Sequence, residues 1–374
     1  MSSIGLQVEE RTFLRRIDWN LAGVIFALNI IGLVVLFSAT HGAVAGSVNR
    51  LFMSQIFWLS VSWILYFIVT LFDYQIFLRM AYVLYGLNLF ALVAVIAFGK
   101  VALGAQRWLD LGFFMYQPSE TMKVTVVLVL ARIMSRKSYP NGMGIKDMIL
   151  PAVLVGVPFV ITAAQPDLGT ALMLIIIGGS ILFFIKIKTK ILMTVGIALA
   201  IALPCAWFFG LKEYQKNRVY TFISPMRDPR GAGYNSIQSR IAVGSGRLFG
   251  KGFRKGTQSQ LEFLPERHTD FIFSVLSEEF GLIGSLITIV FFARLFTLGT
   301  RIASQAREKA GAIVVIGILS ILFWHMFINV GMVIGLLPIV GIPLPLISYG
   351  GSSMLTTMSG LGLISSVAYR KFLF

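Results

Sequence analysis

Long runs of apolar residues divide this sequence, and they constrain its fold more than any other feature. With roughly 20 apolar residues as the length that crosses a lipid bilayer, about ten such segments follow one another along the chain. They begin near Leu21, Leu51, Gln75, Pro118, Met148, Leu168, Ile191, Phe271, Ala310 and Gly351. Hydrophobic residues make up 57% of the 374 residues, and charged residues only 13%. The sequence therefore predicts an integral membrane protein.

Several of these segments have no polar face. Leu174 to Ile185 and Ile191 to Phe209 are apolar all round, which excludes helices at the surface of a soluble protein. Every backbone amide must be hydrogen-bonded inside lipid, and segments of this length achieve that as helices. The predicted fold is all-α, a single polytopic membrane domain over residues 1–374 with about ten transmembrane helices. No internal repeat is visible in the sequence, which argues against the duplicated architecture of many transporters.

The distribution of lysine and arginine predicts which loops face the cytoplasm. Short cytoplasmic loops collect these residues, whereas short outer loops hold few. An orientation with both termini in the cytoplasm satisfies this bias. The first apolar segment is then a retained anchor, because no convincing cleavage site accompanies it. The basic residues assigned to the inner side are Arg11, Arg15, Arg16, Arg132, Arg136, Lys137, Lys146, Lys186, Lys188, Lys190, Arg294, Arg301, Arg307, Lys309, Arg370 and Lys371.

One long outer loop departs from that bias. Residues 211–270, before the eighth helix, carry eleven lysines and arginines against five acidic residues, which long loops are permitted to do. A basic extracytoplasmic loop next to the bilayer attracts an anionic head group, either that of a substrate or that of an acidic phospholipid. Nucleic acid is not expected as a partner, because the loop faces the wrong side of the membrane and no aromatic residues alternate with its cations.

Glycine and basic residues alternate in the middle of this loop, after a predicted short amphipathic helix at Ile237–Val243. Glycine lets backbone amides approach a ligand closely, and interspersed cations neutralise phosphate, as in other anion-binding nests. The pattern predicts a phosphate-binding loop, with a flexible surface loop as the alternative. The residues concerned are Gly244, Gly246, Gly250, Gly252 and Gly256 with Arg247, Lys251, Arg254 and Lys255.

A pair of ionisable residues lies just inside the predicted membrane. Pro118 suits the first position of a helix, which places Glu120 in the positively polarised first turn and Lys123 three residues further on. Charges are costly in a bilayer, so the pair belongs either to a functional site or to a salt bridge between helices. Arg107, in the preceding outer stretch, is either a snorkelling interface residue or part of the same site.

Two further stretches interrupt the apolar pattern. Asp167 joins two apolar runs, either as the N-cap of the second helix or as a carboxylate that faces a ligand. Residues Asn329–Met354 contain prolines and glycines but no charge. Such backbone is tolerated at membrane depth only against protein or a water-filled cavity. We expect this stretch to re-enter the membrane or to cap a cavity, and to offer a ligand the hydroxyls of Ser348, Ser352 and Ser353.

Asp270 lies in the stretch RHTDFIF, directly before an apolar run. A carboxylate there either marks the point where a helix leaves the lipid or faces a substrate whose head group lies at that depth. On the following helix Glu278 should lie within a quarter-turn of the direction of Asp270 and Glu279 on the side opposite Asp270, so they cannot both face one site. We expect His268 to be solvated and His325 to be a hydrogen-bonded polar group of the core.

Five motifs occur in an order that resembles one known family. They read GAQRWLDLG followed by QPSE, AAQPDLGTA, IAVGSG, GTQSQLEFLPERHTDFIFSVLSEEFG and GLLPIVGIPLPLISYGGSS, and they extend over nearly the whole chain. On these motifs the sequence is identified as a member of the SEDS family (shape, elongation, division and sporulation). The wording of GAQRWLDLG and FLPERHTDFIF is closer to the cell-elongation branch than to the division branch.

That resemblance implies a glycosyltransferase of the bacterial cytoplasmic (inner) membrane. The family polymerises lipid II, a disaccharide-pentapeptide on undecaprenyl pyrophosphate, into peptidoglycan strands. The implied partners are a class B penicillin-binding protein, which crosslinks the strands, and other membrane proteins of the elongation complex. Asp270 matches the family's essential acidic residue in the large outer loop.

This substrate allows roles to be assigned by chemistry. Forming a β-1,4 bond from an α-linked pyrophosphate inverts the anomeric carbon, and a carboxylate such as Asp270 takes the proton of the attacking hydroxyl as general base. The departing pyrophosphate needs positive charge, which a divalent cation (Mg²⁺ or Mn²⁺) would also supply, although no compact metal-ligand pattern is present. The candidate cations are Arg107, Arg240, Arg247, Lys251 and Arg254. Further candidate substrate-binding residues are Glu120, Lys123, Asp167, Ser348 and Ser352.

Two other functions remain open, a lipid II flippase and a membrane scaffold for the transpeptidase. A flippase needs charge compensation along a path through the membrane, and it would tolerate Asp270→Asn in part. A polymerase needs a base at one outer point and would lose turnover in that variant, whereas a scaffold would be unaffected. Polar motifs cluster in the outer loops with little charge at mid-membrane depth, which favours the polymerase.

Overall fold

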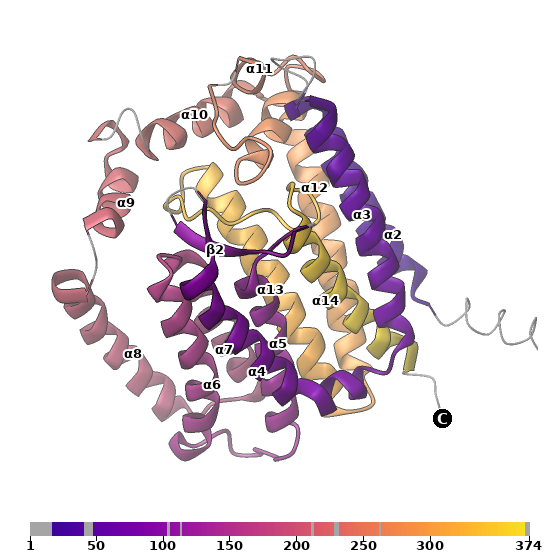
Figure 1. Cartoon of the computed structure of the whole chain (residues 1–374), viewed down its shortest axis with the longest axis vertical. Coiled ribbons are helices and arrows are strands. Elements are labelled where there is room, and N and C mark those ends of the chain that lie inside the picture. Colours follow the sequence, from indigo (N-terminus) through magenta and orange to yellow (C-terminus); the bar gives the residue numbers. More distant parts are fainter. Residues whose placement is uncertain are drawn as a thin grey trace, which may run out of the picture.

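The structure is a computed structural model that describes residues 17–40, 48–102, 105–112, 114–210, 213–227, 232–261 and 263–370. Arg11, Arg15, Arg16 and Lys371, on which part of the predicted orientation rests, lie outside these ranges. Figure 1 shows the longer helices packed side by side in a bundle, with α8 (Thr189–Cys205) standing beside it. The bundle helices are α2 (Trp19–Thr40), α3 (Val48–Leu71), α4 (Tyr74–Phe98), α5 (Pro118–Met134), α6 (Ile145–Ala164), α7 (Leu168–Ile185), α12 (Ile272–Ser304), α13 (Lys309–Val333) and α14 (Gly351–Arg370).

The composition of these helices matches a multi-pass membrane protein. Within the described ranges, seven helices are long and apolar enough to cross a membrane, namely α2, α3, α4, α6, α7, α12 and α13. The other three long helices fall short of that measure. Helices α5 and α8 have 17 residues each, and α14 is rich in serine, threonine and glycine. The prediction of a polytopic membrane protein is confirmed, whereas its number of spans stays a prediction.

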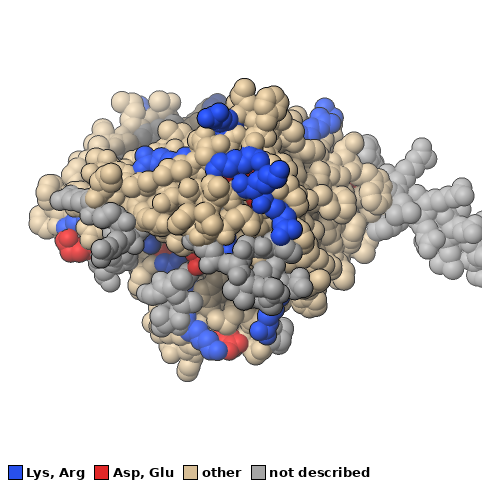
Figure 2. All heavy atoms as spheres, turned by 90° about the horizontal axis from the view of Figure 1, so that it is seen from above, with Lys and Arg blue, Asp and Glu red and all other residues tan. Residues whose placement is uncertain are grey.

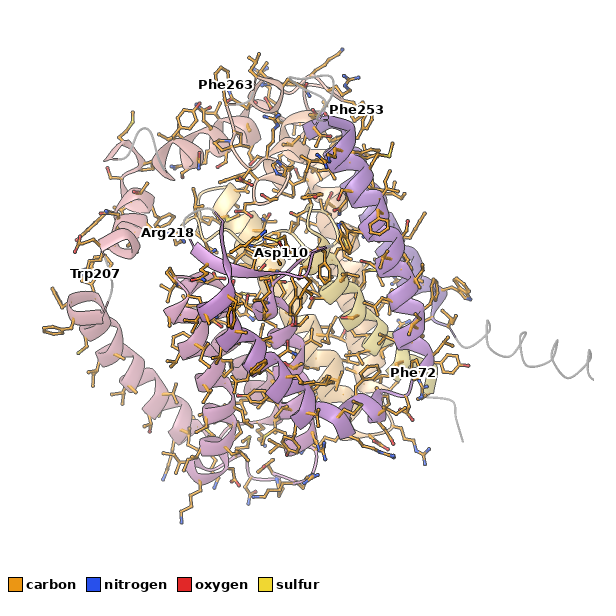
Figure 3. All side chains as sticks on the ribbon, viewed as in Figure 1. Phe72, Asp110, Trp207, Arg218, Phe253 and Phe263 are labelled. Carbon is orange, nitrogen blue, oxygen red and sulfur yellow. The ribbon has the colours of Figure 1, made fainter. Side chains whose placement is uncertain are left out.

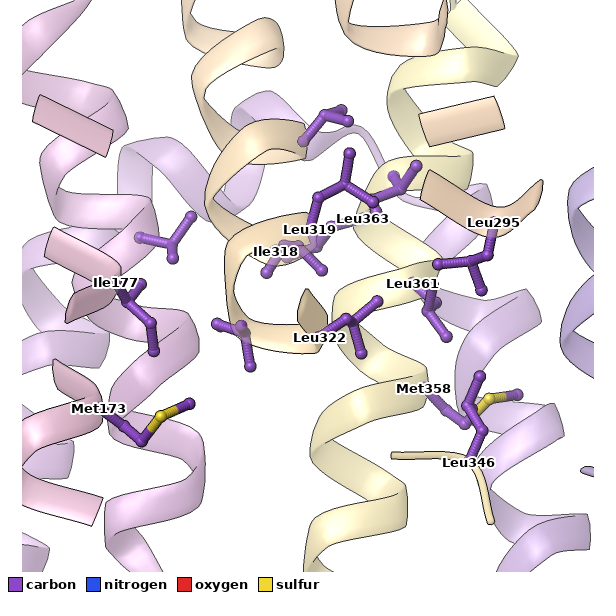
Figure 4. Close-up of a cluster of buried hydrophobic side chains, with 14 of the residues drawn as sticks. Met173, Ile177, Leu295, Ile318, Leu319, Leu322, Leu346, Met358, Leu361 and Leu363 are labelled. Carbon is purple, nitrogen blue, oxygen red and sulfur yellow. The ribbon is translucent and has the colours of Figure 1, made fainter. Parts of the chain in front are cut away.

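The buried core takes side chains from most of the bundle helices, and Figure 4 shows part of it, with Ile177 of α7 and Leu322 of α13. Apolar residues on the outside are exposed as well; Phe90 of α4 is 73% exposed, as suits contact with lipid. Because lipid is as apolar as these side chains, close packing rather than exclusion from water holds the helices together. Gly317 of α13, for example, has no space for a Cβ, because the side chain of Val127 of α5 packs against it.

A small antiparallel sheet, which the all-α prediction did not include, connects α4 to α5. Its strands β1 (Lys100–Ala102), β2 (Ala105–Asp110) and β3 (Met115–Tyr116) lie in the order β1-β2-β3. Gly112, with a φ of 86°, provides the left-handed backbone in the turn between β2 and β3. The fold is therefore mostly helical rather than all-α, and β2 crosses one end of the bundle (Figure 1).

The predicted outer loop contains helices of its own. These are α9 (Glu213–Ile223), α10 (Ala232–Ser245) and the short α11 (Thr257–Gln260). Helix α10 includes Ile237–Val243, so the predicted helix is confirmed, but Ile241 is exposed while Ser239 is buried, so its faces are not the predicted amphipathic ones. Figure 1 shows α10 and α11 beyond the end of the bundle that carries the sheet. Seen from that end, in Figure 2, lysine and arginine side chains outnumber acidic ones, as the charge of this segment requires.

The glycine-rich part of that loop pairs with α12, which explains its glycines without a phosphate ligand. Helix α12 is kinked at Gly281, where φ is 67° and ψ is −160°. The kink frees backbone groups on both sides, and residues 247–252 pair with them through four hydrogen bonds of 2.9 to 3.2 Å. A Cβ at Gly246, Gly250 or Gly281 would collide with the opposite backbone. These glycines therefore allow the backbone of the loop to approach the backbone of α12, whereas the sequence had predicted the approach of a ligand.

Candidate functional site

A cavity of about 560 Å³ opens near the sheet. Its walls come from β2, from the first turns of α5 and α7, from α9, α10 and α13, and from the segments before α12 and after α13. Ionisable side chains gather in this lining, although they are far apart in the sequence. They are Arg107, Glu120, Lys123, Asp167, Arg218, Glu266, Asp270 and His325.

The irregular segment between α13 and α14, residues 334–350, forms one wall of the cavity. Residues 339–343 and 349–350 contribute to the lining, as the sequence predicted for irregular backbone next to a cavity. Gly169, the second residue of α7, allows Val340 to approach, because a Cβ there would collide with the valine side chain. A segment without helix or strand cannot provide hydrogen-bond donors for all its own carbonyls, so neighbouring side chains must donate to them.

Hydrogen bonds to the backbone at and before Asp270 hold this residue in place. The carbonyls of residues 268–270 accept hydrogen bonds, in order, from Tyr349 N at 2.9 Å, Ser348 Oγ at 2.6 Å and Asn329 Nδ2 at 2.8 Å. All three donors belong to α13 or to the irregular segment that follows it. The position of the Asp270 side chain therefore depends on how that segment is placed.

The Asp270 carboxylate is half-buried and makes no hydrogen bond or ion pair within the described part of the chain. Burial, together with the nearby Glu266, raises the pKa of Asp270 to about 6, although Arg107 and Arg218 act in the opposite direction. Gly341, with a φ of 79°, lies against it, since a Cβ there would be 3.2 Å from Oδ2. At neutral pH this carboxylate is mostly ionised, and a pKa close to the working pH suits a general base.

Three ionisable side chains form a buried group deeper in the cavity. Lys123 Nζ lies 2.7 Å from Glu120 Oε1, which confirms the pair predicted from the sequence, and 2.8 Å from His325 Nε2. An ammonium has no acceptor, so Nε2 must accept and the imidazole must be neutral. The other ring nitrogen, next to the carbonyl of Pro343, then carries the proton. His325 is the hydrogen-bonded core residue that was expected, but it also lines the cavity.

Arg107 and Asp167 meet on the opposite wall. Their closest atoms, Nη1 and Oδ1, are 3.6 Å apart, and Arg107 Nη2 donates to the carbonyl of Pro166 at 2.6 Å. Asp167 Oδ1 also accepts from the backbone of Thr170, which confirms the predicted N-cap of α7. Arg107 Nε and Asp167 Oδ2 are buried without a hydrogen-bond partner among the described residues. The predicted ligand-facing role of Asp167 is therefore compatible with its role as a cap.

Almost the whole chain matches a single protein family. The model of the FtsW/RodA/SpoVE family, described as "cell cycle protein", covers residues 18–372. This chain belongs to the FtsW/RodA/SpoVE family. It is 46% identical over 291 residues to the peptidoglycan glycosyltransferase MrdB of Escherichia coli K12, a match that covers 78% of each chain. It is 30% identical over 426 residues to the peptidoglycan glycosyltransferase RodA of Treponema pallidum, covering 95% of this chain and 98% of the relative.

Solved structures agree with this family. The chain is similar to one from a peptidoglycan synthase complex that coordinates polymerization and crosslinking, with a TM-score of 0.82, 28% identity, and 96% of this chain and 99% of that chain covered. The rod shape determining protein RodA of Thermus thermophilus is similar with a TM-score of 0.70 and 27% identity, covering 95% and 98%. The resemblance read from the motifs is thus confirmed.

Three predicted cations of this FtsW/RodA/SpoVE member do not reach the cavity. Arg240 donates to the backbone and side chain of Ser236, one turn earlier on α10. Arg247 belongs to the loop that pairs with α12, and Lys251 Nζ lies 2.7 Å from Oε1 of the buried Glu278. The sequence showed their charge and their glycine neighbours, but it could not show that α12 is the partner.

Two predicted serines likewise support the wall instead of facing the cavity. Ser348 Oγ donates to the carbonyl of Thr269 and accepts from the backbone of Leu344, at 2.6 and 2.8 Å. Ser352 Oγ accepts from the backbone of Gln117 at 3.3 Å. Ser353 does line the cavity, as expected.

The structure also corrects or refines expectations around Asp270. His268 is half-buried rather than solvated, and it lies against the ring of Tyr349 at 6.0 Å. Burial lowers the pKa of His268. Glu278 and Glu279 point away from one another, as predicted, toward Lys251 and Ser38 respectively. Neither glutamate lines the cavity, so neither is a candidate for catalysis.

Arg218 of α9 is the main cavity residue that the sequence did not single out. It lies on α9 (Figure 3), lines the cavity, and acts on the Asp270 carboxylate together with Arg107. The loop has eleven lysines and arginines, and nothing in the sequence around Arg218 distinguishes it from the others. The same is true of Glu266, which shares a loop with Asp270.

A divalent cation fits this site only as an ion shared with substrate. The described residues contain no group of three or more histidine, cysteine, aspartate or glutamate side chains that could hold a metal. Glu120 and Asp167 are already paired with Lys123 and Arg107. Asp270 is the carboxylate left without a partner, and Mg²⁺ in many enzymes is held by one or two carboxylates together with substrate phosphates.

Proposed function

We propose that this chain is a peptidoglycan glycosyltransferase that polymerises lipid II into glycan strands for cell elongation, with Asp270 as the general base. The observation that carries the assignment of the base is the unpaired, half-buried Asp270 carboxylate, with a pKa of about 6, in a cavity that also holds Arg107 and Arg218. The names of the relatives in the FtsW/RodA/SpoVE family support the type of reaction.

The acceptor sugar attacks through its 4-hydroxyl. Its oxygen forms the new bond to the anomeric carbon of the donor while the bond from that carbon to the pyrophosphate oxygen breaks on the opposite face. Asp270 accepts the hydroxyl proton, which increases the nucleophilicity of the oxygen in the transition state. The proton leaves the carboxyl after the products depart, because a group with a pKa of about 6 is mostly ionised at neutral pH.

Positive charge in the cavity offsets the charge that develops on the leaving pyrophosphate. Arg107 and Arg218 line the same cavity as Asp270, and Lys123 lies deeper, with Glu120 and His325. Preorganised donors stabilise developing charge more than flexible ones, because they need no reorganisation during the reaction. Lys123 is buried and held by two partners, so it is the most rigid of the three cations.

The apolar bundle keeps the lipid tail in the membrane while the sugars and pyrophosphate occupy the cavity. We place the chain in the bacterial inner membrane with both termini cytoplasmic and the end with the sheet and α10 outside. The proposed partners are a class B penicillin-binding protein and other membrane proteins of the elongation complex; the similar chain from a peptidoglycan synthase complex supports the first of these. A divalent cation on the pyrophosphate, with Asp270 or Glu120 nearby, would add positive charge there and remains part of the proposal.

The test uses purified protein and labelled lipid II in detergent, with and without a cognate class B penicillin-binding protein, and a gel that resolves glycan strands. We expect polymer from the wild type and none from Asp270→Asn. Asp110→Asn is the matched control, because Asp110 is an exposed aspartate of β2 that does not line the cavity. Detergent leaves no membrane to cross, so a flippase or scaffold gives no polymer even with partner and Mg²⁺ present.

A further inference from the structure

Two buried polar side chains of α13 contact successive carbonyls of the irregular segment. His325 and Asn329 lie one turn apart, and their exposed fractions are 4% and 0%. The ring of His325 lies next to the carbonyl of Pro343, and both residues line the cavity. Asn329 Nδ2 donates to the carbonyl of Ile342 at 2.7 Å. One face of α13 thus holds the part of residues 334–350 that lies beside the cavity.

The same two side chains reach the two charged parts of the cavity. Asn329 Nδ2 uses its second hydrogen on the backbone carbonyl of Asp270, at 2.8 Å. His325 uses its second nitrogen, Nε2, to accept from Lys123 Nζ at 2.8 Å. Helix α13 therefore connects the ammonium of Lys123, which His325 contacts, to the residue with the unpaired carboxylate, whose backbone Asn329 holds.

We propose that His325 and Asn329 act as a bracket, a pair of positioning residues that fixes the Lys123 ammonium and the Asp270 carboxylate relative to one another. This proposal rests on the proposed function, in which Asp270 takes a proton while Lys123 faces the leaving group. Transfer requires both at once, and a misplacement of 1 Å can lower a rate about 100-fold. Neither side chain of the bracket needs to touch the reacting atoms.

The chemistry of each member suits this role. Both hydrogens of the Asn329 amide are donated to carbonyls, and its Oδ1 is buried without a partner among the described residues. Only a group with two donors can make both contacts, since a carboxylate would face two carbonyl oxygens. His325 must accept on one side and donate on the other, which only a neutral imidazole or an amide can do.

The first test compares His325→Leu, which removes the hydrogen bond from Lys123 and the polar contact with Pro343, with His325→Gln, which can both accept and donate. Ser320→Ala is the control on α13, because Ser320 hydrogen-bonds only within its own helix and does not line the cavity. In glycan synthesis from labelled lipid II we expect kcat to fall about 100-fold in His325→Leu, with KM within about threefold of wild type. His325→Gln should recover most of kcat, and Ser320→Ala should match the wild type. A His325→Leu variant with wild-type kcat overturns the proposal.

A double-variant cycle separates positioning from mere stability. If His325 acts through Lys123, replacing His325 by leucine in a Lys123→Met background should lower kcat by less than about threefold, since the coupling is already lost. A loss as large as in the wild-type background overturns the proposal. Melting temperatures of the detergent-solubilised variants identify any that lower kcat by unfolding.

A second measurement does not depend on activity. Hydrogen exchange followed by mass spectrometry measures how fast the backbone amides of residues 266–271 and 342–349 exchange. We expect His325→Leu and Asn329→Ala to exchange at least about tenfold faster there than wild type, because the carbonyl contacts that hold both stretches are lost. Unchanged exchange overturns the bracket. A wild type that makes no polymer, together with faster exchange in the variants, instead rejects the polymerase and keeps the bracket.

Discussion

Replacing Gly341 by alanine tests how closely the irregular segment controls Asp270. Gly341 has a φ of 79°, and a Cβ there would lie 3.2 Å from Asp270 Oδ2. That separation is shorter than an ordinary van der Waals contact of 3.4–4 Å, so the carboxylate must move by a few tenths of an ångström. The left-handed backbone itself costs an L-residue about 1–2 kcal/mol. The variant should therefore be both less stable and slower.

Gly335→Ala is a matched control in the same segment. Its φ is 82°, so the backbone penalty on the free energy of unfolding should be similar, about 1–2 kcal/mol. A Cβ at Gly335 would meet the flexible side chain of Arg240, not Asp270. If a 1 Å displacement costs about 100-fold in rate, a displacement of about a third of an ångström costs about fivefold. We expect that fivefold loss of kcat in Gly341→Ala only.

The assay is glycan synthesis from labelled lipid II at saturating substrate, with melting temperatures measured in the same detergent. We expect Gly341→Ala and Gly335→Ala to lose equal stability but to differ in kcat. Equal kcat in the two variants would refute it, because Asp270 would then be insensitive to the backbone beneath it.

Three further outcomes follow from the same structure. Glycan synthesis should rise as the pH is raised through about 6, since burial raises the pKa of Asp270 and the base must be ionised; a profile of kcat/KM that is flat between about pH 5 and 8 would contradict this. Gly250→Ala should lower the melting temperature sharply, because no space exists for a Cβ against α12, whereas Gly244→Ala, with nothing within 4 Å, should not; equal melting temperatures would count against the pairing of loop and helix. Chelation with EDTA should lower glycan synthesis and Mg²⁺ should restore it, if the pyrophosphate binds a divalent cation in the cavity; unaffected synthesis would remove the metal from the proposal.

The membrane character of the chain and several local features could be predicted because each has a short-range cause. Apolar runs predicted the long helices, Pro118 predicted the start of α5, and Asp167 predicted a cap. The pair of Glu120 and Lys123 follows from their spacing on one helix. These features depend on a few neighbouring residues, so the sequence carries them directly.

The contacts that the sequence could not show share a different cause, which is that the partner lies far away in the sequence. The alternation of glycine with Arg247 and Lys251 was interpreted as a phosphate site, but the glycines accommodate the kinked backbone of α12. Ser348 was expected to bind a ligand, but its hydroxyl donates a hydrogen bond to the carbonyl of Thr269. His325 was expected to be satisfied in the core, and only the packing of α13 beside α5 shows that Lys123 is its partner.

The most direct test of the central claim is a single-turnover measurement of bond formation by Asp270→Asn, with lipid II binding measured on the same preparation. The account predicts unchanged binding and loss of the new glycosidic bond, because the asparagine keeps the shape of the side chain but cannot take the hydroxyl proton. Bond formation close to the wild-type rate, with binding intact, would show that another group is the base.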